Sequence, residues 1–202
     1  MQQDNNNIPE QHTGASVDVV CSKSYATPHE AQKAFYALKE RFLQVNSWEQ
    51  YAGEGSADFK VYSSDRLPVI RSVQQGDYFR INIPGPANPS GEGDDWVQVQ
   101  KITEDESDSE ACISITVKPV PCPLNDDKDV AHFFTNEATS TFIVRRNGNE
   151  LSAEVHGRNE KPNIKGVDIK DTLRNTLVAT GSVFGFSKIQ WKKLTDGLME
   201  GL

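Results

Sequence analysis

The alternation of hydrophobic and polar residues predicts a strand and then two helices near the start of the chain. Apolar residues at every second position from Val17 to Cys21 are typical of a strand with one buried face, and this strand should end near Tyr25. The segment Thr27-Pro28-His29-Glu30 combines an N-cap hydroxyl, a proline at the first helical position and a glutamate placed to close a capping box. The apolar residues that follow recur at steps of three and four, at Ala31, Ala34, Phe35, Leu38 and Phe42. Ser47-Trp48-Glu49-Gln50 repeats the capping-box pattern and predicts a short second helix that stops near Gly53.

Residues 57–157 lack the helical period and carry short alternating runs, which predict strands. These runs contain Phe59 and Val61, then Phe79, Ile81 and Ile83, then Val97 and Val99, then Ile113, Ile115 and Val117, then Phe142 and Val144, and finally Leu151, Ala153 and Val155. Gly76-Asp77 and the acidic segment Glu104 to Glu110 are expected at hairpin ends. Asn147-Gly148 predicts a tight hairpin whose glycine has a positive φ. The run from Val69 to Val73 fits either an edge strand or a loop.

After Gly166 the helical period returns and predicts one long amphipathic helix. Its apolar stripe consists of Ile169, Leu173, Leu177, Phe184, Trp191, Leu194 and Leu198. Gly181 and Gly185 lie in the middle, where each glycine disfavours a helix by about 1 kcal/mol relative to alanine. A close approach or a bend of the helix at this point is therefore expected.

Composition and charge narrow the class of protein. A chain of 202 residues fits one domain, for which residues 16–202 are expected, after a disordered polar tail of residues 1–15. The net charge of -8 argues against nucleic acid as a partner, because such binding relies on Lys and Arg displacing counterions from phosphates. Without a basic start, or an apolar run of about 20 residues, no targeting segment or membrane span is expected. Three cysteines without CxxC spacing suit a reducing compartment and predict a cytoplasmic protein.

The residues offer little catalytic chemistry. Histidine is the natural general base near neutral pH, but His12 lies in the tail, His29 in an exposed first helical turn, and His156 should point away from the core. His132 remains as a weak catalytic candidate. No Ser, His and acid trio is evident. The acidic segments Asn125 to Asp129 and Gly91 to Asp95 do not match a calcium loop or a phosphate cradle, so neither a metal nor a cofactor is expected.

Two proline-bearing loops, residues 83–95 and 118–129, either frame a cavity entrance or act as rigid surface connectors. Asn136 and Ser140 are expected on the apolar face of the strand that carries Phe142. Polar groups in that position either orient a ligand or bind buried water.

The order of these elements resembles the helix-grip fold of the START-like superfamily, which includes birch-allergen-like proteins and polyketide cyclases. The resemblance covers roughly residues 15–202, and its local cue is the entry Tyr25 to Ala31 with Phe35, Leu38 and Trp48 after it. It implies an α+β domain in which an antiparallel sheet of about seven strands wraps around the long C-terminal helix. It also implies a cavity between sheet and helix for lipids, sterols, polyketides or hormones. The segment Val61 to Leu67 contains no glycine, so the glycine-rich loop of the plant members is absent and their ligands are not carried over.

The predicted function is to bind an apolar or amphipathic small molecule in this cavity. The expected lining residues are Phe79, Ile81, Val97, Val99, Ile115, Asn136, Ser140, Phe142, Leu177, Gly181 and Phe184. Two alternatives stay open. One is a cyclase or hydratase that uses His132 or a cavity carboxylate as general acid or base, and the other is a protein-interaction module with a collapsed cavity. A void of a few hundred cubic ångströms would favour a ligand or a substrate.

Overall fold

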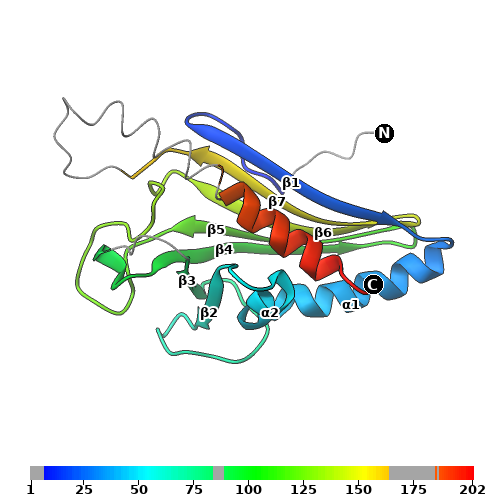
Figure 1. Cartoon of the computed structure of the whole chain (residues 1–202), viewed down its shortest axis with the longest axis horizontal. Coiled ribbons are helices and arrows are strands. Elements are labelled where there is room, and N and C mark those ends of the chain that lie inside the picture. Colours follow the sequence, from blue (N-terminus) through cyan, green and yellow to red (C-terminus); the bar gives the residue numbers. More distant parts are fainter. Residues whose placement is uncertain (1–6, 84–88, 164–184, 186) are drawn as a thin grey trace.

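A seven-stranded antiparallel sheet organises the molecule (Figure 1). The structure is a computed structural model that describes residues 7–83, 89–163, 185 and 187–202. The strands follow the order β1-β7-β6-β5-β4-β3-β2, so the first two strands of the chain form the two edges of the sheet. Their bounds are β1 Ala15–Ser24, β2 Asp58–Tyr62, β3 Tyr78–Asn82, β4 Asp95–Glu106, β5 Glu110–Pro119, β6 Thr139–Asn147 and β7 Glu150–Glu160.

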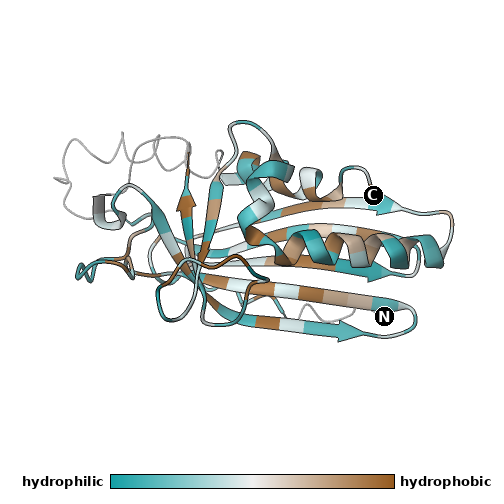
Figure 2. Ribbon diagram, turned by 90° about the horizontal axis from the view of Figure 1, so that it is seen from below, coloured by the Kyte–Doolittle hydropathy of each residue, from teal (hydrophilic) through white to brown (hydrophobic). Residues whose placement is uncertain are grey.

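Helices cover one face of this sheet, and the prediction of an α+β fold is confirmed. Helix α1 (Pro28–Leu43), the 3-10 turn η1 (Val45–Ser47) and helix α2 (Trp48–Ala52) connect the two edge strands, and the turn η2 (Pro89–Gly91) precedes β4. A C-terminal helix, described over residues 187–199, crosses the same face as α1 (Figure 1). The view from below shows this one-sided cover and the apolar bands of the strands beneath it (Figure 2). This arrangement fits a helix-grip fold.

The start of α1 follows the sequence pattern closely. The Thr27 hydroxyl accepts a hydrogen bond from the Glu30 backbone N–H, and the Glu30 carboxylate accepts one from the Thr27 N–H. The five apolar residues predicted to face inward are the buried residues of this helix. The prediction of a second capping box was wrong, because the Ser47 side chain makes no capping hydrogen bond to α2. The predicted end of α2 before Gly53 is confirmed.

Trp48 fills the centre of the space between the helices and the sheet. It is fully buried, and its indole N–H donates to the Phe42 carbonyl at 3.0 Å. Its ring lies 5.2 Å from Phe59, 6.1 Å from Phe79 and 4.9 Å from Phe142, measured between ring centroids. Burial of such aromatic surfaces is a main source of folding free energy. The centre of the sheet is therefore packed with protein side chains.

The C-terminal helix is held at both ends of its described part. The Gln190 amide accepts from the Ala57 N–H at 3.0 Å and donates to the Gly55 carbonyl at 3.1 Å. Further along, Gly197 lies so close to α2 that an added Cβ would sit 2.0 Å from the Tyr51 carbonyl oxygen. The close approach of this helix to another element therefore occurs at Gly197, which was not among the glycines predicted to make one. An added Cβ at Gly185 would meet nothing within 4 Å, and Gly181 lies outside the described residues.

The segment before β1 is tied to the end of β7 by Asn159. The Asn159 amide oxygen accepts from the His12 and Thr13 N–H groups at 2.8 and 3.1 Å, and its amide nitrogen donates to the Glu10 carbonyl. The Asn159 N–H donates to the Gln11 side chain at 2.9 Å. Residues 10–13 therefore have defined partners. The division into a tail of residues 1–15 and a domain of residues 16–202 stays a prediction.

The hairpins between β4 and β5 and between β6 and β7 lie at or within one residue of their predicted turns. β4 and β5 meet at residues 107–109, inside the predicted acidic segment, and β6 pairs with β7 as expected. Residues 69–73 form no strand, although the Val69 N–H donates to the Val61 carbonyl of β2 and Val73 is buried in the core. In the last hairpin Asn147 pairs with Glu150, so the two loop residues are Gly148 and Asn149 and not the predicted Asn147 and Gly148; the predicted positive φ of Gly148 is confirmed.

Replacing Gly148 by valine should lower the free energy of unfolding by about 1 kcal/mol or more. Gly148 has φ of 58°, a conformation that a β-branched residue strongly disfavours, and an added Cβ would meet no atom within 4 Å. The cost is therefore a backbone cost. Urea denaturation of Gly148→Val measures it, with Gly148→Asn as the matched control, since asparagine tolerates positive φ. Equal midpoints for the two variants at equal slopes would contradict this interpretation.

Candidate functional site

A small pocket lies between one end of the sheet and the C-terminal helix. Its cavity volume is about 30 Å³. The apolar part of its lining consists of Ala57, Ile81, Ile83, Phe133, Phe134 and the Trp191 ring, and the polar part consists of His132, Ser140, Glu160, Ser187 and Gln190. None of these lining residues is a lysine or an arginine. The pocket is thus an apolar space with a few polar groups, the usual composition of a ligand site.

Glu160 reaches this pocket because the end of β7 is irregular. Asn159, held by the segment before β1, has φ of 56°, and the pairing of β1 with β7 shifts register between Ala15 and Val17. Gly157 then leaves the room that the Glu160 carboxyl occupies, since an added Cβ at Gly157 would sit 2.1 Å from Glu160 Oε1. The irregular strand end therefore turns an acidic side chain into the interior.

The Glu160 carboxyl is buried and forms no ion pair with any residue that the structure describes. Its residue is 1% exposed, and its Oε2 has no hydrogen-bond partner among the described residues. Burial raises the pKa of Glu160 from 4.5 to about 7, while the charge of Arg158 lowers it and that of Asp18 raises it. A buried carboxyl with a strongly raised pKa in a pocket marks a candidate functional site.

Two further polar atoms of the pocket residues lack partners in the part of the chain that the structure describes. These are the Ser187 hydroxyl and the Trp191 indole N–H, both on the C-terminal helix. The Trp191 ring packs edge-on against Phe142, with ring centroids 5.4 Å apart, so its position is fixed by the core. Leaving a buried donor or acceptor unpaired costs about 1–3 kcal/mol each, and such atoms call for an explanation.

His132, the weak catalytic candidate, lines the same pocket but is held as a neutral ring. Its Nδ1 accepts from the Phe134 N–H at 2.9 Å, and its ring stacks on Phe133. Burial lowers the pKa of His132 to about 3. At neutral pH the ring is therefore uncharged and carries its hydrogen on Nε2. A group with so low a pKa is a poor general base.

The structure distributes the predicted lining residues over two regions. Ile81 and Ser140 line the pocket. Phe79, Val97, Val99, Ile115 and Phe142 are buried in the packed core around Trp48. Asn136 does not lie on a strand: it occupies an exposed turn before β6 begins at Thr139. Leu177, Gly181 and Phe184 lie outside the described residues.

Sequence reasoning missed Glu160 and Ser187 and assigned Trp191 only to an apolar stripe. Strict alternation along β7 predicts that Glu160 points to the same face as His156 and Arg158, and the Asn159 irregularity reverses this. The adjacent Gly157 and Asn159 were the available signal, because glycine and asparagine are the residues that tolerate close approach and positive φ.

The outer face of the same strand carries a separate ionic cluster. As predicted, His156 points away from the core, yet it is buried there between Asp18 and Glu154, at 2.6 and 2.9 Å. Arg158 pairs with Asp18 at 2.8 Å. Burial alone lowers the pKa of His156, but its hydrogen bonds to Glu154 and Asp18 outweigh burial and raise it. These groups satisfy one another, which makes the cluster structural.

The described residues offer no metal centre. They contain no group of three or more His, Cys, Asp and Glu side chains that could hold a metal ion. In the loop from Asn125 to Asp129, the Asn125 and Asp127 side chains accept bonds from the Asp127 and Asp129 N–H groups, which accounts for the loop geometry. None of the described helices is both long and apolar enough to cross a membrane.

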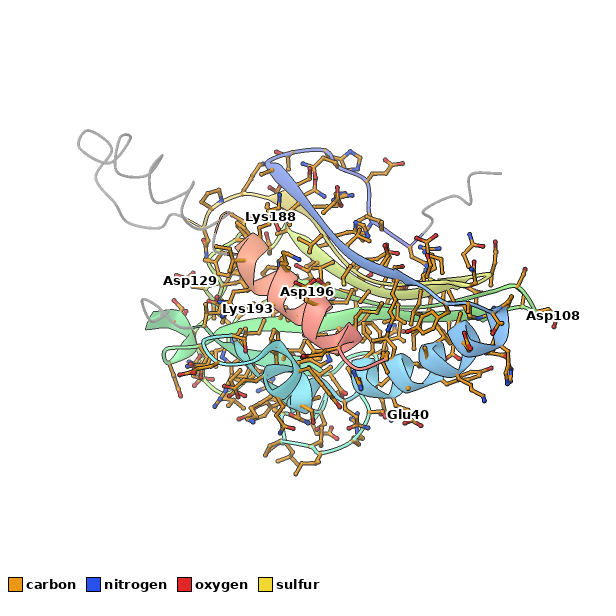
Figure 3. All side chains as sticks on the ribbon, turned by 45° about the vertical axis from the view of Figure 1, so that its right-hand side comes forward. Glu40, Asp108, Asp129, Lys188, Lys193 and Asp196 are labelled. Atoms are coloured by element: carbon orange, nitrogen blue, oxygen red, sulfur yellow. The ribbon has the colours of Figure 1, made fainter. Side chains whose placement is uncertain are left out.

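Over residues 187–199, the C-terminal helix does not bring a cation to the pocket from its outer side. Lys188 is exposed, as Figure 3 shows with Lys193 and Asp196 on the same helix. Lys192 pairs with Asp196 at 2.7 Å, and Lys193 donates to the Glu54 carbonyl at 2.9 Å. The charge of Glu160 therefore has no direct partner on this helix among the described residues.

Comparison with known proteins yields similar structures only. No family model matches the chain, and no curated protein matches it. A hypothetical protein from Helicobacter pylori is 10% identical with a TM-score of 0.45, covering 89% of this chain and 84% of that one. A putative uncharacterized protein from Bacillus thuringiensis is 13% identical with a TM-score of 0.39, covering 92% of this chain and 100% of that one. Ara h 8.0201 is 10% identical with a TM-score of 0.32, covering 89% of this chain and 99% of that one.

Replacing Glu160 by glutamine should change how stability depends on pH. The pKa of Glu160 is higher in the folded protein than its ordinary value of 4.5, so the folded state stays protonated at this group to a higher pH than the unfolded state. The wild type should therefore lose up to about 3 kcal/mol of unfolding free energy through this group as pH rises from about 4.5 to 7. Glu160→Gln should lack this loss, because glutamine does not ionise. The unfolding free energy of the variant relative to wild type should therefore rise between about pH 4.5 and 7 and stay constant at higher pH.

Urea denaturation of both proteins at several pH values measures this difference. Glu137→Gln is the matched control, because Glu137 is exposed and paired with Lys161. A difference between Glu160→Gln and wild type that does not vary with pH would show that the carboxyl is not desolvated.

Proposed function

We propose that this chain is a START-like protein of the cytoplasm that binds an apolar small molecule carrying one polar group. The observation that carries the proposal is the Glu160 carboxyl, buried in an apolar pocket with an unpaired oxygen. Unpaired Ser187 and Trp191 atoms among the same lining residues support it, because a bound ligand would satisfy all three groups.

The pocket volume limits what can enter without rearrangement. A cavity of about 30 Å³ has room for one or two water molecules, not for a lipid. The polar end of the ligand therefore occupies this pocket. Admission of an apolar chain requires neighbouring side chains to move aside, at a cost that the pairing of buried polar atoms offsets.

A second candidate is an acid or base enzyme of the cyclase or hydratase type. The observation in its favour is the pKa of about 7 at Glu160, which suits a group that both takes up and releases a proton near neutral pH. Glu160 replaces His132 as the candidate here. An interaction module with a collapsed cavity agrees with the packed centre around Trp48, but it leaves the three unpaired polar atoms without a role.

Binding can be tested with 1-octanol and the three tryptophan indole resonances. Trp48 and Trp96 already donate their indole N–H groups to the Phe42 and Gly91 carbonyls, at 3.0 and 3.4 Å. Only the Trp191 N–H is unpaired among the described tryptophans, so octanol in the pocket should shift its resonance downfield and leave the other two nearly unchanged. Heteronuclear NMR titration measures these shifts.

The location of binding is tested by filling the pocket. Ser140→Leu places a bulky side chain in the cavity and should abolish the Trp191 shift, whereas Ser22→Leu, an identical change at an exposed position of β1, should preserve it. An unmoved Trp191 resonance at millimolar octanol, or wild-type binding by Ser140→Leu, would contradict the proposed site.

A further inference from the structure

We propose that the pocket selects a neutral hydroxyl-bearing ligand and rejects carboxylates, with Glu160 as the residue that sets this choice. The inference rests on the proposed function and specifies the chemical class of the polar group. It follows from what the three unpaired atoms can donate and accept, and from the charges that face the pocket.

The unpaired atoms require a partner that both donates and accepts. The Trp191 indole N–H can only donate, and Glu160 Oε2, when ionised, can only accept. The Ser187 hydroxyl can do either. A ligand hydroxyl can accept from Trp191 or Ser187 while it donates to Glu160. An ammonium group has no acceptor and leaves the Trp191 donor unpaired, whereas an ionised carboxylate has no donor for Glu160.

The charges around the pocket oppose an anion. Of the titratable lining residues, His132 is neutral at physiological pH, and the other is Glu160 itself. Arg158 and Asp18 influence Glu160 through their charge, but they pair with each other, and Lys161 beside it pairs with Glu137 at 2.8 Å. A ligand carboxylate would therefore meet an acidic group in an apolar space with no cation in the described lining, and two such charges repel strongly.

The test compares three ligands of equal chain length: 1-octanol, octanoate and octylamine. At about pH 8, where both Glu160 and octanoate are ionised, octanol should bind wild type at least roughly tenfold more tightly than octanoate does. At about pH 6, where Glu160 is mostly protonated, the gap should narrow. Titration of the Ser140 and Glu160 backbone amides by NMR gives all the dissociation constants.

Two variants separate charge from hydrogen bonding. Glu160→Gln should improve octanoate binding by roughly tenfold relative to octanol at about pH 8, whereas Glu137→Gln, which removes the same charge at an exposed site, should not. Trp191→Phe should weaken octanol binding several-fold and leave the ratio of octanol to octanoate affinity unchanged, because it removes a donor without changing charge. It also keeps the test decisive if Glu160→Gln fails to fold.

The outcomes distinguish this inference from the proposed function. If octanol binds in the pocket and octanoate binds wild type equally well at about pH 8, the selection by Glu160 is wrong while the binding site stands. Tighter binding of octylamine than of octanol, lost in Glu160→Gln, would show a cation site and also overturn the hydroxyl assignment. If no ligand shifts the pocket resonances, the proposed function itself fails.

Discussion

The packing of Trp48 against the sheet is the interaction on which the interior of the fold depends. Its ring packs against Phe79 and Phe142, and the Trp191 ring packs edge-on against Phe142. The centre is filled by aromatic rings, and the pocket lined by Ile81 and Ser140 lies at the end of the sheet. Large rigid rings fix the helices as well, because any shift would open a void that costs packing energy.

The position of Glu160 depends in turn on contacts made far away in the sequence. Asn159 keeps its positive φ because its side chain and backbone bond to residues 10–13, which precede the first strand. A non-glycine residue in that conformation needs surrounding structure to hold it. The segment before β1 therefore supports the acidic group of the pocket without touching the cavity. This coupling explains why a polar N-terminal segment contributes to the architecture of a buried site.

The sequence predicts the fold well and the candidate site poorly, for a physical reason. Strand and helix positions follow from local period and capping, and the Thr27 box and the β6–β7 hairpin formed as the pattern indicates. Ser140 was placed correctly because regular alternation fixes the face of a residue within a strand. Glu160 was missed, because the positive φ of Asn159 turns the Glu160 side chain to the opposite face of β7. Asn136 was misplaced because β6 begins three residues later. The position of Trp48 in the centre depends on tertiary packing, which no local pattern encodes.

The two buried ionisable groups of strand β7, His156 and Glu160, have opposite electrostatic environments. On the outer face, His156 is held between two carboxylates, so its charge is compensated and its pKa rises. On the inner face, Glu160 Oε2 has no hydrogen-bond partner among the described residues. Burial raises the pKa of Glu160 and so favours its neutral form. The same strand thus shows that the fold can supply counter-charges where structure needs them. Their absence from the described lining around Glu160 leaves a desolvated acid that a hydrogen-bonding guest would stabilise and an anionic guest would not. This asymmetry costs folding free energy, and that cost supports the proposal that the pocket binds a ligand.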